Sequence, residues 1–149
     1  MDQHSKYDNY TYPSAPEGRT PTLIRKDEWQ RSGEALRGLF RGKDHHTKVT
    51  FIRYVTEEVG AGPTLHVHPY DEIFTIQEGR ARFTVGDQVI DAEAGDVLIG
   101  PANIPHGYQN LGPGRLDSLD IHLSPEWIQY DIGDSWENGN CLASTESKV

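Results

Sequence analysis

The stretch His66-Val67-His68-Pro69-Tyr70-Asp71-Glu72 holds three potential metal ligands within seven residues. The two histidines are two positions apart, so both side chains point to the same face if this stretch is extended. Glu72 follows four residues after the second histidine and starts what we expect to be the next strand. These three side chains are the first part of a candidate metal site.

A third histidine ends a turn-rich stretch that runs from Gly95 to His106. Three imidazoles and one carboxylate suit a divalent transition ion. We therefore expect one such ion per chain, Fe, Mn, Ni, Cu or Zn. Its predicted ligands are His66, His68, Glu72 and His106.

Short strands separated by frequent turn signals surround these ligands. Valine, isoleucine, threonine and aromatic residues favour strands, and Gly86-Asp87 is a tight hairpin signal. The pattern predicts an all-β, antiparallel sandwich or barrel. The expected strands are 48–56, 65–68, 72–77, 81–85, 88–90, 97–99, 106–110 and 116–123.

The two ends of the chain differ from this central region. Residues 1–47 are expected to form an N-terminal arm and a lead-in to the barrel at 48–124. Tyr7, Tyr10 and Tyr12 could hold the arm against a neighbouring subunit or could simply be exposed. Residues 125–149 are expected to form a short C-terminal helix and a tail, because Ser124-Pro125 suits a helix N-cap and first position.

The spacing of the candidate ligands resembles the two motifs of the cupin family. The first motif is Gly, five residues, His-X-His, three or four residues, Glu, six residues, Gly. Here it reads Gly60, His66, His68, Glu72 and Gly79. The second is Gly, five residues, Pro-X-Gly, two residues, His, three residues, Asn. Here it reads Gly95, Pro101, Asn103, His106 and Asn110.

Asn103 is the one departure, because the family has glycine there. Asparagine tolerates left-handed backbone better than most residues, so we expect the turn to survive. The resemblance covers residues 48–124 once. It implies a double-stranded β-helix, or jelly-roll, cupin barrel with a metal inside it, usually in a homodimer.

Further polar residues could reach the same cavity. On the last strand Asp120 and His122 alternate with Leu119, Ile121 and Leu123, so only one of the two sets faces inward. The favoured interpretation is that the apolar set fills the barrel. If the polar set faces inward, it could supply a general base or support a metal ligand.

Parity along the strands gives further expectations. Tyr108 shares the parity of His106, and it could hydrogen-bond a substrate or be a core tyrosine. Arg53 is expected to face outward. The candidate catalytic residues are Glu72, Tyr108 and His122. An apolar cavity is expected from Phe74, Ile76, Phe83 and Ile99.

Composition limits the possible classes of partner. The 149 residues carry 23 acidic and 14 basic side chains, a net charge of −9, which does not suit nucleic-acid binding. A mean hydropathy of −0.67 without a long apolar run does not suit a membrane span. Cys141 is the only cysteine, so no intrachain disulfide forms, and we expect a reducing, cytoplasmic setting.

These observations favour a metal-dependent enzyme that acts on a small organic molecule of aromatic, enol, diketone or polyketide-like type. Dioxygenase chemistry is placed slightly ahead of metal-dependent isomerase, cyclase, lyase or decarboxylase chemistry. A cupin that binds a small ligand without turnover is the second alternative. A proton-transfer group within reach of the metal would favour acid–base chemistry.

Overall fold

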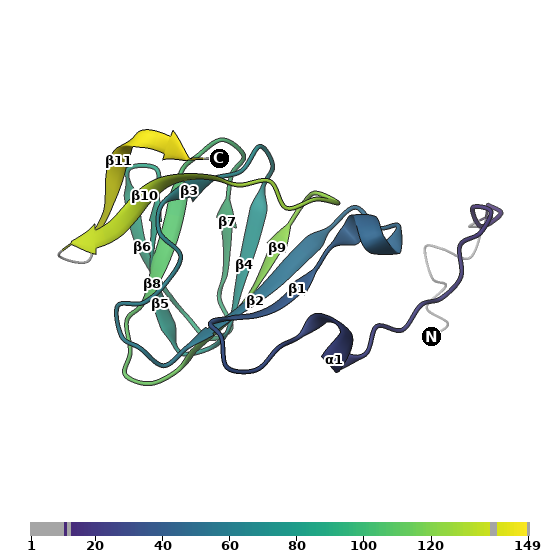
Figure 1. Cartoon of the computed structure of the whole chain (residues 1–149), viewed down its shortest axis with the longest axis horizontal. Coiled ribbons are helices and arrows are strands. Elements are labelled where there is room, and N and C mark those ends of the chain that lie inside the picture. The colour runs from purple at the N-terminus through teal and green to yellow at the C-terminus, as the bar shows by residue number, and fades with distance from the viewer. Residues whose placement is uncertain (1–10, 12, 138–139, 149) are drawn as a thin grey trace, which may run out of the picture.

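The computed structural model describes the backbone of residues 11, 13–137 and 140–148, and side chains up to residue 132. Tyr7, Tyr10 and Tyr12 lie outside the described residues. Two antiparallel sheets face each other and enclose the core, while the N-terminal segment runs away from them (Figure 1). The all-β, double-stranded β-helix prediction is confirmed.

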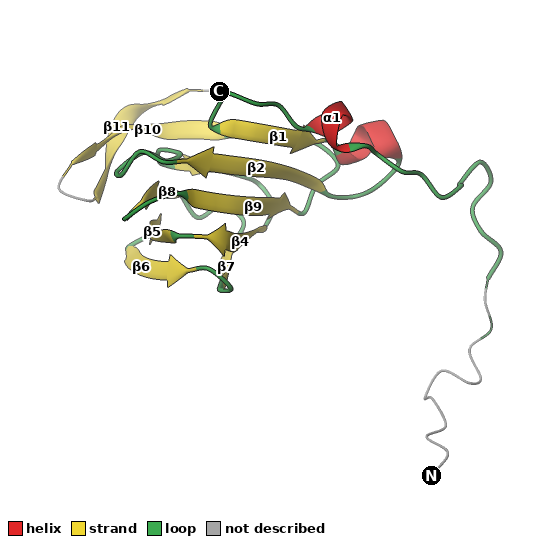
Figure 2. Ribbon diagram, turned by 90° about the horizontal axis from the view of Figure 1, so that it is seen from below, coloured by secondary structure: helices red, strands yellow, loops and turns green. Residues whose placement is uncertain are grey.

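The first sheet has five strands in the order β1-β2-β9-β4-β7. The second has six strands in the order β11-β10-β3-β8-β5-β6. Figure 2 shows β1, β2 and β9 one below another, with the short helices beyond one end of β1. The strands are β1 (Leu36–Phe40), β2 (Thr50–Thr56), β3 (His66–Val67), β4 (Glu72–Glu78), β5 (Arg80–Val85), β6 (Gln88–Glu93), β7 (Val97–Gly100), β8 (His106–Asn110), β9 (Leu116–His122), β10 (Tyr130–Glu137) and β11 (Asn140–Lys148).

Strand β4 shows how the alternating pattern divides core from exterior. Glu72, Phe74 and Ile76 are buried, while the residues between them are partly exposed. Aromatic and aliphatic side chains from both sheets meet this face and form one cluster. Its largest members are Phe74, Phe83, Tyr108 and Leu116.

Register between strands brings the polar residues of the site together. In the first sheet Glu72 of β4 is opposite His122 of β9, and Phe74 is opposite Asp120. In the second sheet His66 of β3 is opposite His106 of β8. Because the partner of an inward-facing residue also faces inward, these pairings fix which side of β9 lines the barrel.

The segments on either side of the expected barrel contain regular structure. The lead-in carries the one-turn helix α1 (Lys26–Trp29), the 3-10 helix η1 (Gly42–His45) and strand β1, which pairs with β2. Within the described residues, no helix has the length and apolar character needed to cross a membrane.

The expected C-terminal helix is wrong. Residues 123–126 form a bend in which the Ser124 hydroxyl accepts a hydrogen bond from the Glu126 N–H at 3.1 Å, so the capping group closes a local turn. The chain then enters β10, which pairs with β3 and β11. The sheet edge offered by β3 therefore prevails over the local helix signal.

Candidate metal centre

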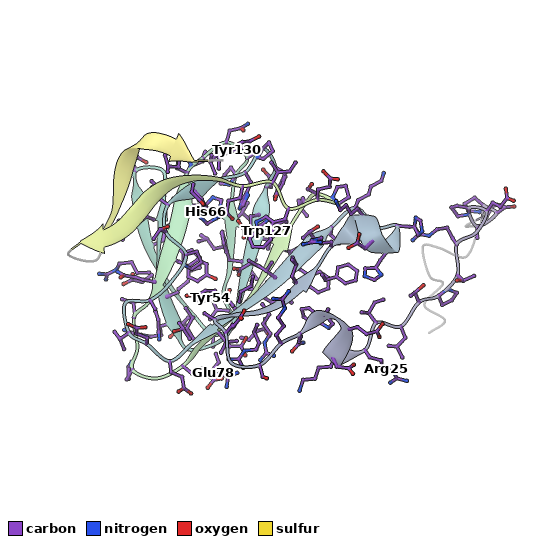
Figure 3. The ribbon with its side chains drawn as sticks, in the orientation of Figure 1. Arg25, Tyr54, His66, Glu78, Trp127 and Tyr130 are labelled. Carbon is purple, nitrogen blue, oxygen red and sulfur yellow. The ribbon has the colours of Figure 1, made fainter. Side chains whose placement is uncertain are left out.

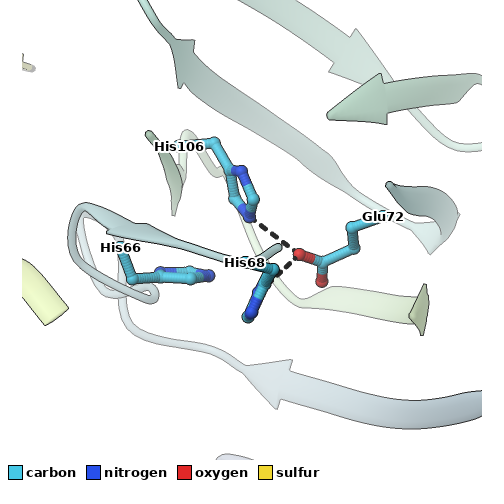
Figure 4. Close-up of side chains that lie close together, drawn as sticks. All are labelled: His66, His68, Glu72 and His106. Atoms are coloured by element: carbon cyan, nitrogen blue, oxygen red, sulfur yellow. Dashed lines mark hydrogen bonds and ion pairs between the residues drawn. The ribbon is translucent and has the colours of Figure 1, made fainter. Parts of the chain in front are cut away.

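Four predicted ligands come together from the two facing sheets, on or next to strands β3, β4 and β8. His66 lies on β3 and His68 just after it, while Glu72 begins β4 and His106 begins β8. All four side chains are buried, and their ligand atoms lie within 4.8 Å of one another (Figure 4). The pairing of β3 with β8 accounts for this convergence of residues 40 positions apart in sequence.

The Glu72 carboxylate sits among histidine rings. Its Oε2 lies 2.7 Å from Nε2 of His106 and 3.0 Å from Nε2 of His68. Burial acts to raise the pKa of Glu72, but contacts with the His106, His122 and His68 rings outweigh burial and hold this pKa well below its usual range. Glu72 is therefore an ionised carboxylate, the form that binds a metal.

Backbone carbonyls orient the three motif histidines. Nδ1 of His66 lies 2.7 Å from the carbonyl oxygen of Thr64. Nδ1 of His68 lies 2.5 Å from the carbonyl oxygen of Ile128. Nδ1 of His106 lies 3.1 Å from the carbonyl oxygen of Ile104. Carbonyl oxygens only accept hydrogen bonds, so each Nδ1 carries the proton. Each Nε2 is then presented to the cavity, as in metal-binding histidines.

The donor set fits a divalent transition ion. Nε2 of His68 is buried and has no hydrogen-bond partner among the described residues, which is costly unless a cation completes the site. Burial, followed by the neighbouring His106, lowers the pKa of His66 to about 4, so this imidazole is neutral at physiological pH. Three imidazole nitrogen donors and one carboxylate suit Mn, Fe, Ni, Cu or Zn.

The turn at Asn103 has the backbone that the second motif requires. Asn103 has φ = 63°, in the left-handed region, so the expectation that asparagine preserves this turn is confirmed. Its N–H donates to the His68 carbonyl at 2.9 Å. The turn thus ties the loop before His106 to the residue that follows β3.

A cavity of about 190 Å³ opens beside the ligands between the two sheets. Tyr54, His66 and Trp127, which are labelled in Figure 3, line this space. Most of its wall is aliphatic and aromatic. The lining residues are Leu36, Ile52, Tyr54, Gly62, Pro63, His66, Glu72, Phe74, Tyr108, Asp120, His122, Trp127 and Gln129.

The polar set of β9 faces this cavity, so the favoured interpretation of that strand is wrong. Asp120 and His122 are each 1% exposed, whereas Leu123 is 45% exposed. Hydrophobicity favours the apolar set inside, but the register with β4 places the polar set beside Glu72. The polar lining of a metal site explains the exception.

Asp120 is held by two hydroxyl groups inside the barrel. Tyr108 donates its O–H to Oδ2 at 2.7 Å, and Ser118 donates a short hydrogen bond to Oδ1. Burial and then the negative charge of Glu72 raise the pKa of Asp120 to about 8, although both hydroxyl groups act to lower it. Tyr108 is both a core residue and a cavity residue.

Tyr70 is a site residue that sequence reasoning missed. Its hydroxyl lies 2.9 Å from Nδ1 of His122, and it also accepts from the Ile128 N–H at 3.0 Å and donates to the Ile128 carbonyl at 3.1 Å. The same carbonyl contacts His68. Its position between the motif residues His68 and Glu72 was the available signal, although nothing in its residue type assigned this role.

The remaining expectations about the cavity have mixed outcomes. Phe74 lines it, while Ile76 and Phe83 pack in the adjoining core. Ile99 is 59% exposed, so its assignment to the cavity is wrong. Arg53 is outside the cavity and forms a bidentate pair with Asp117 at 2.6 and 3.0 Å, as expected for an outward-facing residue.

Comparison with known proteins agrees with this geometry. Residues 53–122 match the family model described as the cupin domain. The chain carries a cupin domain. A search of curated proteins gives no significant match.

Solved structures resemble this chain in fold. An uncharacterized Klebsiella pneumoniae protein with a double-stranded β-helix domain aligns with a TM-score of 0.57 and 20% identity, over 85% of this chain and 100% of that one. An oxalate decarboxylase mutant from Bacillus subtilis gives 0.64 and 23%, over 85% of this chain and 36% of that one. An oxalate oxidase gives 0.51 and 18%, over 55% and 45%. This chain thus spans about a third of the oxalate decarboxylase chain.

Proposed function

We propose that this cupin is a metal-dependent enzyme that isomerises, cyclises or cleaves a small organic molecule by proton transfer. The observation that carries the proposal is Asp120, a buried carboxyl group that lines the same cavity as the predicted metal ligands His66 and Glu72. A general acid–base group works best when its pKa lies near the working pH. The pKa of Asp120, raised to about 8, meets that condition.

The surroundings of Asp120 suit a group that gains and loses a proton. When the carboxyl is ionised, the hydroxyl groups of Tyr108 and Ser118 stabilise it as hydrogen-bond donors. When it is protonated, burial favours the neutral form. We infer that Asp120 transfers the substrate proton, while Tyr108 positions the Asp120 carboxyl group through the hydrogen bond at 2.7 Å.

A bound divalent ion would supply Lewis-acid polarisation of a substrate carbonyl or enol oxygen. His66, His68, Glu72 and His106 would hold that ion. Phe74 and Tyr54, which contribute to the cavity wall, would exclude water from the substrate. The chain's own part is therefore to orient the substrate and to transfer its proton at Asp120.

Size and charge narrow the substrate class. A cavity of about 190 Å³ is close in scale to the ~150 Å³ cavity that holds benzene in an engineered protein. None of the described residues that line it is lysine or arginine. We infer a small, uncharged or singly charged hydroxy, keto or enol compound, rather than a dicarboxylate or a large polyketide.

Dioxygenase chemistry is the second candidate, and the apolar cavity wall favours it. Leu36, Ile52 and Phe74 would shield a reactive intermediate from water. The two candidates differ in their need for oxygen and in their need for Asp120. An experiment that varies both separates them.

The test uses proton nuclear magnetic resonance in D₂O under nitrogen. The protein, loaded in turn with Mn(II), Fe(II), Ni(II), Cu(II) or Zn(II), is mixed with small hydroxy, keto and enol compounds. We expect loss of a substrate C–H signal or formation of product without oxygen. The rate of this reaction should be at least about 100-fold lower in Asp120→Asn.

Asp91→Asn is the matched control, because Asp91 is paired with Arg82 on the exposed side of β5 and β6. It should leave the rate unchanged. Turnover that consumes oxygen and stops under nitrogen would overturn the proposal in favour of a dioxygenase. Binding of these compounds without proton exchange or product would favour a ligand-binding cupin.

The partner and the compartment are also proposals. We propose a small-molecule substrate, a homodimer and a cytoplasmic setting, since the family resemblance and the lone Cys141 support them. Light scattering that gives the mass of one chain at working concentration would contradict the dimer.

A further inference from the structure

A fourth histidine, His122, approaches the metal centre from β9. Its side chain is 1% exposed, and its Nε2 lies 3.0 Å from Oε1 of Glu72. The motif histidines His68 and His106 face the other oxygen, Oε2. The Glu72 carboxylate therefore has imidazole nitrogens against both of its oxygen atoms.

The tautomer of His122 follows from its contact with Tyr70. A tyrosine hydroxyl has one proton, and Tyr70 donates that proton to the Ile128 carbonyl at 3.1 Å. The contact between Tyr70 and Nδ1 of His122, at 2.9 Å, is then an N–H of His122 donated to the tyrosine oxygen. In a neutral ring this leaves Nε2 of His122 with a bare lone pair.

Nε2 of His122 has no hydrogen-bond partner among the described residues, although it is buried. Nε2 of the motif ligand His68 is in the same condition. The ring centroids of His68 and His122 are 4.6 Å apart, the same separation as between His66 and His106. A nitrogen lone pair that faces a carboxylate oxygen in a buried space is costly, and a bound cation would compensate it.

We propose that His122 is a fifth protein ligand of the metal ion. Four histidines then share one arrangement, in which an oxygen atom holds Nδ1 and Nε2 points into the site. The inference rests on the metal site of the proposed function and deepens it.

The fifth ligand changes what the ion can do. If the bound ion accepts six ligands, His122 and the four motif residues would leave one position for substrate. A substrate oxygen at that position would be polarised beside Asp120. Simultaneous chelation of a substrate and binding of dioxygen would need more open positions.

Side-chain ¹⁵N nuclear magnetic resonance tests the proposal in the unmodified protein. Histidine is labelled, and Zn(II) is added to one equivalent. We expect the Nε2 signals of four histidines to shift to the position of a metal-bound nitrogen, while each Nδ1 stays protonated. Shifts of only three histidines would overturn the proposal.

Variants then identify the fourth signal. We expect His122→Gln to remove it and to weaken Co(II) binding, measured by competition with a chelator, by roughly tenfold or more. His45→Gln is the matched control, because His45 lies in η1, away from the site, and stacks on Phe40 of β1. This substitution should change neither readout. Co(II) affinity within twofold of the parent in His122→Gln would overturn the proposal.

These readouts need no substrate, so they separate the two proposals. Four coordinated histidines without proton-transfer activity would leave the fifth ligand in place and overturn the proposed reaction. Proton transfer with only three coordinated histidines would support the proposed reaction and overturn the fifth ligand.

Discussion

Tyr108 and Asp120 are joined by a 2.7 Å hydrogen bond inside the barrel, between strands that belong to different sheets. The tyrosine is in the hydrophobic cluster, and the aspartate lines the cavity beside the metal ligands. The bond therefore connects the packed core to the group that we propose as the proton carrier.

Tyr108→Phe tests this connection. The substitution leaves Oδ2 of Asp120 without its donor, so we expect a loss of about 1–3 kcal/mol in the free energy of unfolding. The pKa of Asp120 should rise further above its value of about 8, because the hydrogen bond from Tyr108 favours the ionised form. Urea unfolding and ¹³C titration of the carboxyl measure the two effects. Unchanged values for both would show that the bond carries little energy.

His106→Ala tests the predicted ligand set. We expect bound metal to fall by tenfold or more, with the barrel still folded, because His106 supplies one of the four mutually close ligand atoms. Elemental analysis gives the metal content, and circular dichroism checks the fold. His46→Ala is a suitable control, since His46 is exposed outside the site. Full metal occupancy in His106→Ala would remove His106 from the ligand set.

The pH dependence of the free energy of unfolding of the metal-free protein tests the pKa of His66. Its pKa is about 4 in the folded protein and 6.5 in the unfolded chain, so the unfolded chain binds more protons between these values. The contribution of His66 to stability is full above pH 6.5 and falls by about 3 kcal/mol as the pH drops to 4. Urea unfolding across this range, with a chelator present, measures the decline.

His66→Gln is the comparison for that experiment. Its stability should fall less steeply between pH 6.5 and 4, because glutamine does not titrate. Other groups, Asp120 among them, contribute to both proteins, so the difference between the two curves isolates His66. Parallel curves would mean that the imidazole is not held neutral by burial.

Asn103 offers a test of the turn that positions His106. Its φ of 63° strains a β-branched residue, so we expect Asn103→Val to cost about 1–2 kcal/mol. Asn103→Gly should be close to neutral, since glycine adopts this backbone freely. Thermal unfolding of the two variants measures the contrast. Equal losses would point to the asparagine side chain rather than to its backbone.

The sequence predicted the barrel and the four motif residues because their spacing reflects local strand geometry. Two positions along a strand return a side chain to the same face, as for His66 and His68. The orientation of β9 did not follow, because alternation separates its two sets without saying which faces inward. The pairing of Glu72 with His122 decides that question, and it joins residues 50 positions apart.

The C-terminal segment could not be predicted for a related reason. The Ser124-Pro125 signal describes only local preference, whereas β10 forms because Tyr130 and Asp131 find partners on β3. An edge of this kind exists only after the barrel has assembled. Pairing that depends on distant residues therefore prevails over a short helix signal.

The backbone of Ile128 has a consequence beyond its role as a hydrogen-bond partner. Its carbonyl contacts His68, and its N–H is donated to Tyr70, so the chain leaving the barrel is fastened to residues of the metal centre. Metal binding and the ordering of the segment around Ile128 are then thermodynamically linked, because an ion that fixes His68 also stabilises the hydrogen bond between His68 and Ile128. The amide of Ile128 should exchange with deuterium more slowly as metal is added. The exchange rate of this one peptide group would therefore report the fraction of sites with metal bound.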